Sequence, residues 1–308
     1  MMKKLAVFMA FCAIATTSAD GGSQLPAEKI AADAKWVFFL DVSQFRDGTL
    51  WTGVQEKFSD TRMQKGIEMF QDRLGYHPVE DVDTVVMYGN VMERGKGVFL
   101  MEGDFNVKRM VSVVKEKKDY GSEEHDGMKL HHWKHSRHGR TMEVWGTALG
   151  SEQILVADSR ERLTSAVSVV RQEEKQLDVE SPLVSSYPSG NVVGYAATLK
   201  FPEVGGKSDS QKAEILKRTS EGHAFVREQG RDLNMKMSLK AATEEDSQKI
   251  QDILKGMLAL TSLEGTGKEQ PSSMRADILQ SVEISRSGKR VHAEVSFPSR
   301  KLLKAMSK

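Results

Sequence analysis

The order of hydrophobic and polar residues along the chain predicts a succession of short strands and amphipathic helices. Runs of β-branched and aromatic residues bounded by glycine, serine or asparagine predict strands, and apolar residues spaced three and four apart predict helices. The predicted strands cover residues 36–42, 82–88, 97–105, 128–133, 142–147, 153–157, 192–201, 233–241, 282–286 and 290–297. The predicted helices cover residues 49–58, 62–74, 107–117, 160–172 and 210–228, and two more begin after Thr243 and at Pro298.

The fold class that follows is α+β, with two similar halves, each a mainly antiparallel sheet with helices packed on one face. The similarity rests on a strand-to-helix joint that occurs at residues 103–111 and again at 295–303. In both places a phenylalanine, a capping residue, two cations and two apolar residues follow in the same order. The expected division is a flexible lead-in at 20–28, a first domain at 29–172, a proline-punctuated linker at 173–190 and a second domain at 191–308.

The first 19 residues have the pattern of a secretory signal peptide. Lys3 and Lys4 form a positive start, residues 5–15 form a short apolar run, and the small residues 17–19 predict cleavage before Asp20. The apolar run is shorter than the roughly 20 residues that span a bilayer. We therefore expect an exported protein of the periplasm or the extracellular space.

Charge is nearly balanced over the 308 residues, with 44 Lys+Arg against 43 Asp+Glu. This balance gives no reason to expect nucleic acid as a partner. The single cysteine, Cys12, lies in the predicted signal peptide, so we expect no disulfide and no thiol nucleophile after cleavage. No later segment is a long apolar run, so we expect no transmembrane segment after cleavage.

A histidine-rich stretch is the sharpest local feature of the sequence. It contains His125, His131, His132, His135 and His138. Imidazole binds zinc, copper and nickel, and the spacing of His131, His135 and His138 would place three ligands on one face of a helix. Residues 128–133 have a strand pattern instead, in which neighbours point to opposite faces. A polar hairpin is therefore favoured, and a zinc, copper or nickel site at these three histidines is the alternative.

The same predicted hairpin carries a candidate binding surface of aromatic and cationic side chains. Trp133 and Trp145 lie on neighbouring predicted strands, and two exposed aromatic rings on one sheet would form a platform for a partner. Lys134, Arg137 and Arg140 add positive charge that would attract an anion or an acidic surface. Packing of the two tryptophans across strands in the core is an equally consistent interpretation.

The sequence offers little support for catalysis. It has no G-x-S-x-G nucleophile elbow. The glycine–lysine loop at residues 205–208 has Phe201 where a phosphate-binding loop needs glycine. His77, His223 and His292 have no recognisable serine or aspartate context in the sequence. The sequence therefore does not decide whether the protein is an enzyme, and it favours a protein without enzymatic activity.

Three further stretches accompany the predicted signal peptide. They are the opening strand at residues 34–42, Leu74-Gly75 followed by the acidic stretch 78–83, and Ser287-Gly288-Lys289 in the last hairpin. Together they resemble the uncharacterised exported proteins of planctomycete- and verrucomicrobia-like bacteria. The resemblance covers most of the chain and implies an exported protein. It supplies no catalytic residues.

The function expected from these observations is that of an exported, non-enzymatic binding or structural module of the periplasm or cell envelope. Its partner would be an unknown protein or glycan that docks on a sheet face or in a groove between the halves. The first alternative is a metal-binding protein or metal-dependent hydrolase that uses the histidines between His125 and His138. The second is an envelope-surface protein held by basic patches.

Overall fold

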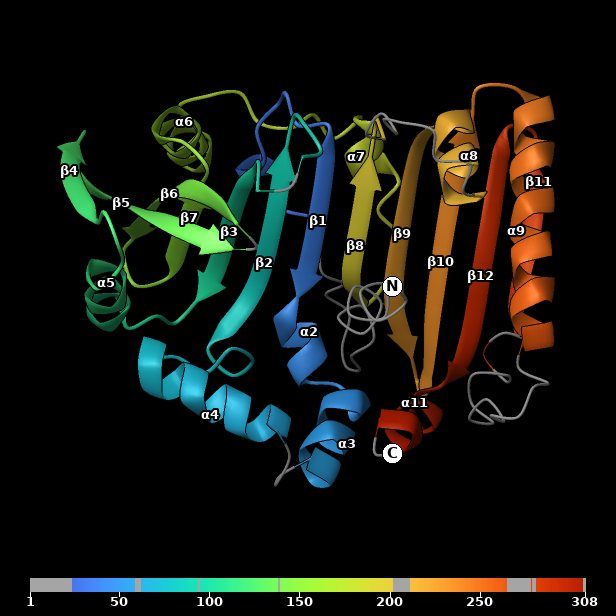
Figure 1. Cartoon of the computed structure of the whole chain (residues 1–308), viewed down its shortest axis with the longest axis horizontal. Coiled ribbons are helices and arrows are strands. Elements are labelled where there is room, and N and C mark those ends of the chain that lie inside the picture. The colour runs from blue at the N-terminus through green and yellow to red at the C-terminus, as the bar shows by residue number, and fades with distance from the viewer. Residues whose placement is uncertain are drawn as a thin grey trace. The chain divides into compact units, whose positions relative to one another are not determined.

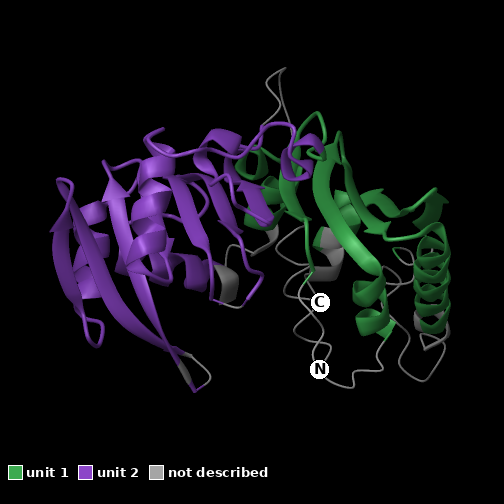
Figure 2. Cartoon of the chain, turned by 90° about the horizontal axis from the view of Figure 1, so that it is seen from above, with its two compact units in different colours: residues 1–23, 44–57, 186–308 green, residues 24–43, 58–185 purple. Residues whose placement is uncertain are grey.

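A computed structural model describes residues 24–58, 62–93, 95–137, 139–201, 211–264, 278 and 281–306. The predicted signal peptide at residues 1–19 and the glycine–lysine loop at 205–208 lie outside the described residues. The chain divides into two compact units, coloured separately in Figure 2. Unit 1 comprises Gln44–Lys57 and Ser186–Lys308 together with the undescribed N-terminal residues, and unit 2 comprises Gln24–Ser43 and Phe58–Ser185. No helix in the described parts of the chain is long and apolar enough to cross a membrane.

Unit 2 is built on an antiparallel sheet with the strand order β1-β2-β3-β7-β6-β5-β4 (Figure 1). Leu163 and Val167 of α6 are fully buried where this helix packs on β6 and β7. Its strands are β1 (Trp36–Asp41), β2 (Val82–Gly89), β3 (Val98–Gly103), β4 (Gly121–His125), β5 (Met128–Arg137), β6 (Arg140–Leu149) and β7 (Gln153–Ala157). Its helices are η1 (Ala27–Lys29), α4 (Arg62–Leu74), α5 (Val107–Lys115), α6 (Arg160–Val170) and α7 (Pro182–Ser185).

Unit 1 is built on a second set of antiparallel strands with the order β11-β12-β10-β9-β8. Its strands are β8 (Val192–Thr198), β9 (Thr219–Gln229), β10 (Asp232–Ala241), β11 (Val282–Ser287) and β12 (Arg290–Pro298). Its helices are α3 (Thr49–Phe58), α8 (Gln211–Arg218), α9 (Glu244–Glu264) and α11 (Ser299–Met306), and α2 (Val42–Arg46) lies at the division between the units.

One face of the unit 1 strands is covered by α8 and α9. Leu239 of β10 and Val291 of β12 lie opposite each other and are buried with Ile215 of α8 and Ile250 of α9. Met237 packs against the same cluster from two residues along β10. Because side chains alternate between the faces of a strand, the even-numbered residues of β10 point away from these helices.

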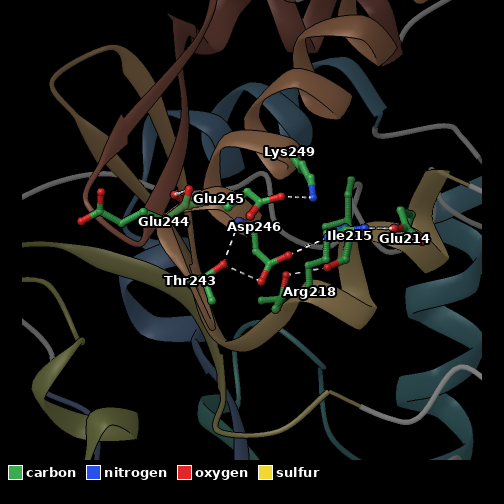
Figure 3. A network of polar contacts seen from close by, with 10 residues as sticks. Glu214, Ile215, Arg218, Thr243, Glu244, Glu245, Asp246 and Lys249 are labelled. Atoms are coloured by element: carbon green, nitrogen blue, oxygen red, sulfur yellow. Dashed lines mark hydrogen bonds and ion pairs between the residues drawn. The ribbon is translucent and has the colours of Figure 1, made fainter.

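A network of charged side chains holds α8 against the start of α9 (Figure 3). Arg218 donates hydrogen bonds to Glu214 at 2.5 Å and to Asp246 at 2.6 Å, so it joins the end of α8 to the first turn of α9. Thr243 caps α9 by accepting a hydrogen bond from the backbone N–H of Asp246 at 3.0 Å. The acidic side chains in this turn also lie at the positive end of the helix dipole.

The mixed α/β fold with antiparallel strands and several helices is as predicted. Side chains cap two of these helices, since Asn106 accepts from Arg109 N–H at 3.1 Å and Ser159 from Arg162 N–H at 3.2 Å. Two elements differ from the prediction. The expected helix at 210–228 ends at Arg218, and the short edge strand β4 was not predicted.

The second half of the expected helix is a strand because its backbone finds partners on both sides. Residues 219–229 pair with β10 on one edge and with β8 on the other, and these hydrogen bonds override a weak helix propensity. Glycine suits position 222 of this strand because the side chains of Leu239 and Phe201 pack closely there, and an added Cβ would lie 3.0 Å from each of them.

The division along the chain differs in detail from the expected ranges. Residues 44–57 belong to unit 1, where Thr49 of α3 donates a 2.5 Å hydrogen bond to Glu228 of β9. The expected linker at 173–190 is packed over part of its length. Leu177 N–H donates to the Ile30 carbonyl at 2.7 Å, and Leu183 of α7 is fully buried.

Candidate functional site

The predicted histidine cluster lies on the β4–β5–β6 edge of unit 2, and its members have separate environments. His131 is buried, and its Nδ1 lies 2.9 Å from the hydroxyl of Tyr120. Burial lowers the pKa of His131, and the charges of Lys129 and Lys115 lower it further. His135 is exposed further along β5, and His138 lies outside the described residues.

No metal centre forms among the described histidines of this hairpin. Across the described ranges of the chain, no three His, Cys, Asp or Glu side chains come together as a metal site would require. His132 stacks on Trp145 with ring centroids 4.6 Å apart, and its Nδ1 is 4.0 Å from Glu143. His125 is next to Asp126, with Nε2 and Oδ2 3.3 Å apart. These rings are held by their own neighbours.

The two tryptophans of the candidate binding surface lie on opposite faces of their sheet. Trp145 pairs with His132 and Trp133 pairs with Val144, so one residue of register separates the tryptophans. Trp145 is buried, and the ring of Trp133 lies against Gly146. The structure therefore does not bring the tryptophans together as a platform.

The cations of the same surface are only partly described. Lys134 forms an ion pair with Asp119 at 3.1 Å. Arg137 and Arg140 pair at the end of the β5–β6 hairpin, and their side chains lie outside the described part of the structure. The positive charge of Lys134 is therefore partly offset.

Unit 1 presents a different set of chemically active side chains on the strand face that points away from α8 and α9. We call it the polar face, and it comprises Glu221, His223 and Phe225 of β9, Lys236, Ser238 and Lys240 of β10, and Arg290, His292 and Glu294 of β12. The register aligns these residues in three rows across the strands. The side chains of Lys236, Lys240, Arg290 and Glu294 are 36%, 43%, 38% and 47% exposed, so the face meets solvent.

The central row of the polar face consists of His223, Ser238 and His292. Ser238 pairs directly with His223 on one side and with His292 on the other, which places its side chain between two imidazoles. The two rings are partly exposed, whereas Ser238 is 0% exposed. Among the described residues, neither Ser238 Oγ nor His292 Nδ1 has a hydrogen-bond partner. Unpaired buried polar atoms are uncommon in folded proteins and call for an explanation.

The outer rows of the polar face carry ion pairs. Glu221 accepts from Lys240 at 2.9 Å and from Arg290 at 3.0 Å, and Lys236 lies 3.1 Å from Glu294. Glu283 of β11 lies opposite Glu294 in the same row, so the two outer rows hold three cations and three carboxylates. Of these cations, Lys236 and Arg290 are the two that act on both rings of the central row.

Both histidines of the central row are less basic than usual. Burial lowers the pKa of His223, and the charges of Arg290 and the neighbouring His292 lower it further. Burial also lowers the pKa of His292, with Lys236 and Arg290 acting in the same direction. These shifts favour the neutral form of each ring, in which it offers one N–H donor. The positive charges of Lys236 and Arg290 beside the rings favour an anion over a cation.

The sequence prediction did not find this site. His223 fell in the expected helix at 210–228, and His292 and Ser238 lie far from it in sequence. The signal that was available is that the polar residues Glu221, His223 and Arg227 lie at odd positions, with small or apolar residues at 222, 224 and 226, which is a strand pattern.

Comparisons with known proteins give only distant likenesses. No protein-family model matches the chain, and no curated protein matches it at a significant level. The chain is similar in structure to crystal form III of TP0453, with a TM-score of 0.49 and 11% identity over 92% of this chain and 98% of that one. For crystal form I the TM-score is 0.48, with 11% identity over 92% and 97%. For crystal form IV it is 0.46, with 10% identity over 93% and 98%.

Proposed function

We propose that this chain is an exported binding protein of the periplasm or cell envelope, without enzymatic activity, whose partner docks on the polar face of unit 1. The observation that carries the proposal is the central row, where the buried hydroxyl of Ser238 has no partner among the described residues. Leaving such a group unpaired costs about 1–3 kcal/mol. A contact made by a partner would explain why this cost is retained.

The charge pattern of the polar face supports the same proposal. Its ion pairs leave the long side chains of Lys236, Lys240 and Arg290 between about a third and a half exposed, where a partner can reach them. Phe225 adds an aromatic surface, and Arg227 lies over its ring at 5.7 Å. A partner that fits is polar and carries negative charge, which a protein or a glycan of the envelope can provide.

Residues 1–19 support the proposed location, since a positive start, a short apolar run and a small-residue site follow in the order of a signal peptide. Expression of the full chain followed by intact-mass measurement tests this part. We expect the exported form to begin at Asp20. A chain that keeps residues 1–19 in the cytoplasm would contradict the proposed location.

We further propose that the two units are similar halves. In unit 2, β3 leads into α5, and in unit 1, β12 leads into α11. Each joint has the order phenylalanine, capping residue, two cations and two apolar residues. The antiparallel strands of each unit are consistent with this relationship.

Site-specific photocrosslinking tests docking on the polar face. A photoreactive phenylalanine analogue at Ser296, an exposed residue of β12 on this face, is compared with the same analogue at Lys255, an exposed residue of α9. We expect an adduct in envelope fractions from position 296 that unlabelled protein competes away, and none from position 255. Equal adducts from both positions, or none from 296, would overturn the proposal.

A further inference from the structure

The central row has the composition of an anion site in a place where sequence motifs give no hint of one. His223 and His292 are two strands apart, so their backbones are about 10 Å from each other with only Ser238 between them. Ser238 is fully buried between the two rings, and neither its Oγ nor His292 Nδ1 has a hydrogen-bond partner among the described residues. The rings are partly exposed and therefore lie between solvent and the buried Ser238 hydroxyl.

The groups around Ser238 donate hydrogen bonds or carry positive charge. Ser238 offers an O–H, and each neutral imidazole offers an N–H. Lys236 and Arg290 are near enough to both rings to affect their charge, and Lys240 is in the next row. The carboxylates that face the rings are already engaged, Glu221 by two cations and Glu294 by Lys236.

We propose that His223, Ser238 and His292, with Lys236 and Arg290, form a binding site for an oxyanion of the phosphate class. This inference rests on the proposed function, because it names the chemical group by which the partner is held. Five donor groups converge from three strands, more than the two oxygens of a carboxylate accommodate well. The three or four terminal oxygens of a phosphate group match them. The positive charges of Lys236 and Arg290 beside the rings favour an anion.

The burial of Ser238 determines the order in which an anion would contact these groups. An oxyanion first meets the imidazole edges and the cations, because Ser238 is fully buried beneath them. Rotation of a ring then admits an oxygen to the Ser238 hydroxyl, which gains the partner that it lacks among the described residues. In the proposed site, the bound anion therefore provides the hydrogen bonds that the anion-free protein lacks.

The charge of the site changes with pH through the two rings. His223 faces Glu221, Lys236, Arg290 and His292, and His292 faces Lys236, Arg290 and Glu294. Proton uptake by either ring adds positive charge beside the bound anion. Anion binding consequently tightens as the pH falls below the ordinary histidine range, and the bound anion raises the affinity of the rings for protons by linkage.

Nuclear magnetic resonance of the histidine rings in the full chain tests the site. The probes are inorganic phosphate at pH 7.5, and sulfate at pH 7.5 and 6.0, because sulfate keeps its charge over this range. We expect saturable shifts of the His223 and His292 ring signals, and tighter sulfate binding at pH 6.0. The Ser238→Ala variant should weaken binding about tenfold or more, since a hydrogen bond to a charged group is lost.

A pair of arginine variants separates the local site from general charge. Arg290→Met removes a rim cation and should weaken binding and its dependence on salt. Arg286→Met removes the same charge from β11, where the residue pairs with Val291 on the helix-covered side, and should leave binding unchanged. Thermal unfolding of each variant checks that the fold is retained.

Three outcomes would overturn the inference. No saturable ring shift with millimolar phosphate or sulfate would remove the oxyanion site, while a positive crosslink at position 296 would leave the proposed function standing. Succinate binding as tightly as phosphate would overturn the phosphate class in favour of a carboxylate. Equal losses from Arg286→Met and Arg290→Met would reduce the effect to net charge.

Discussion

Replacement of Ser238 by alanine should stabilise unit 1, although it removes a polar residue from the centre of a candidate site. Ser238 is 0% exposed, and its hydroxyl has no partner among the described residues. Burying an unpaired hydroxyl costs about 1–3 kcal/mol, and the methyl group of alanine carries no such penalty. Part of the gain is offset by the lower strand propensity of alanine and by the small void left behind. We expect Ser238→Ala to raise the free energy of unfolding by about 1 kcal/mol.

Ser247 provides a matched control within the same unit. It is also 0% exposed, but its hydroxyl donates to the Glu244 carbonyl at 2.7 Å and lies 2.8 Å from the Gly288 carbonyl. The second contact joins α9 to the turn between β11 and β12. Ser247→Ala therefore removes a satisfied group and leaves the Gly288 carbonyl without this partner. We expect a loss of about 1–2 kcal/mol.

Urea unfolding measures both variants, with the transition assigned to unit 1 by the hydrogen-exchange protection of the β10 amides. The two serines have equal exposure, so opposite signs would isolate hydrogen-bond satisfaction as the cause. A loss of stability in Ser238→Ala as large as that in Ser247→Ala would refute the reasoning. It would mean that the Ser238 hydroxyl already has a partner in solution.

Three further predictions concern other parts of the fold. Burial raises the pKa of Glu102, but the hydrogen bonds that Glu102 accepts, first of all from Lys29, outweigh burial and lower the pKa below its ordinary value of 4.5. The ionised form of Glu102 therefore stabilises unit 2 at pH values above 4.5. Glu102→Gln should cost about 1–3 kcal/mol at pH 7 and flatten the loss of stability on acidification, measured by urea unfolding against pH. Gly97→Ala should destabilise unit 2 by about 1–3 kcal/mol in the same assay, because φ is +133° and a Cβ would lie 2.7 Å from the Tyr88 carbonyl oxygen. Arg218→Met should loosen α8, seen as faster amide exchange in α8 and in the first turn of α9 and unchanged exchange in α6.

Much of the fold could be predicted because its strands and helices have signals within short stretches of the sequence. The alternation of Leu233 to Ala241 marks β10, and the serine before Arg160 caps α6. These signals depend on neighbours within a few residues. The helix predicted at 210–228 failed at the point where local and distant terms compete. Residues such as Glu221 and Ala224 suit a helix, but pairing with β8 and β10 decides for a strand.

The candidate site could not be predicted because register creates it. His223, Ser238 and His292 are separated along the chain by 15 and 54 residues and meet only when β9, β10 and β12 align. A shift of one residue in either pairing would turn a histidine to the opposite face. The histidine-rich stretch was a candidate metal site because its histidines are close together in sequence. In the structure, the described histidines of that stretch contact their own neighbours, Tyr120 and Trp145 among them.

The polar face also shows why a binding site and a stable sheet make opposing demands. The face that packs on α8 and α9 gains stability from Leu239 and Val291, which exclude water. On the other face, Ser238 has no hydrogen-bond partner among the described residues, and Lys236 and Arg290 disfavour protonation of both imidazoles. Each of these features is unfavourable in the free protein and becomes favourable when an anion is present. The apolar contacts of the helix-covered face can therefore offset the free-energy cost of the unpaired polar groups on the other face. The two sets of side chains alternate along each strand.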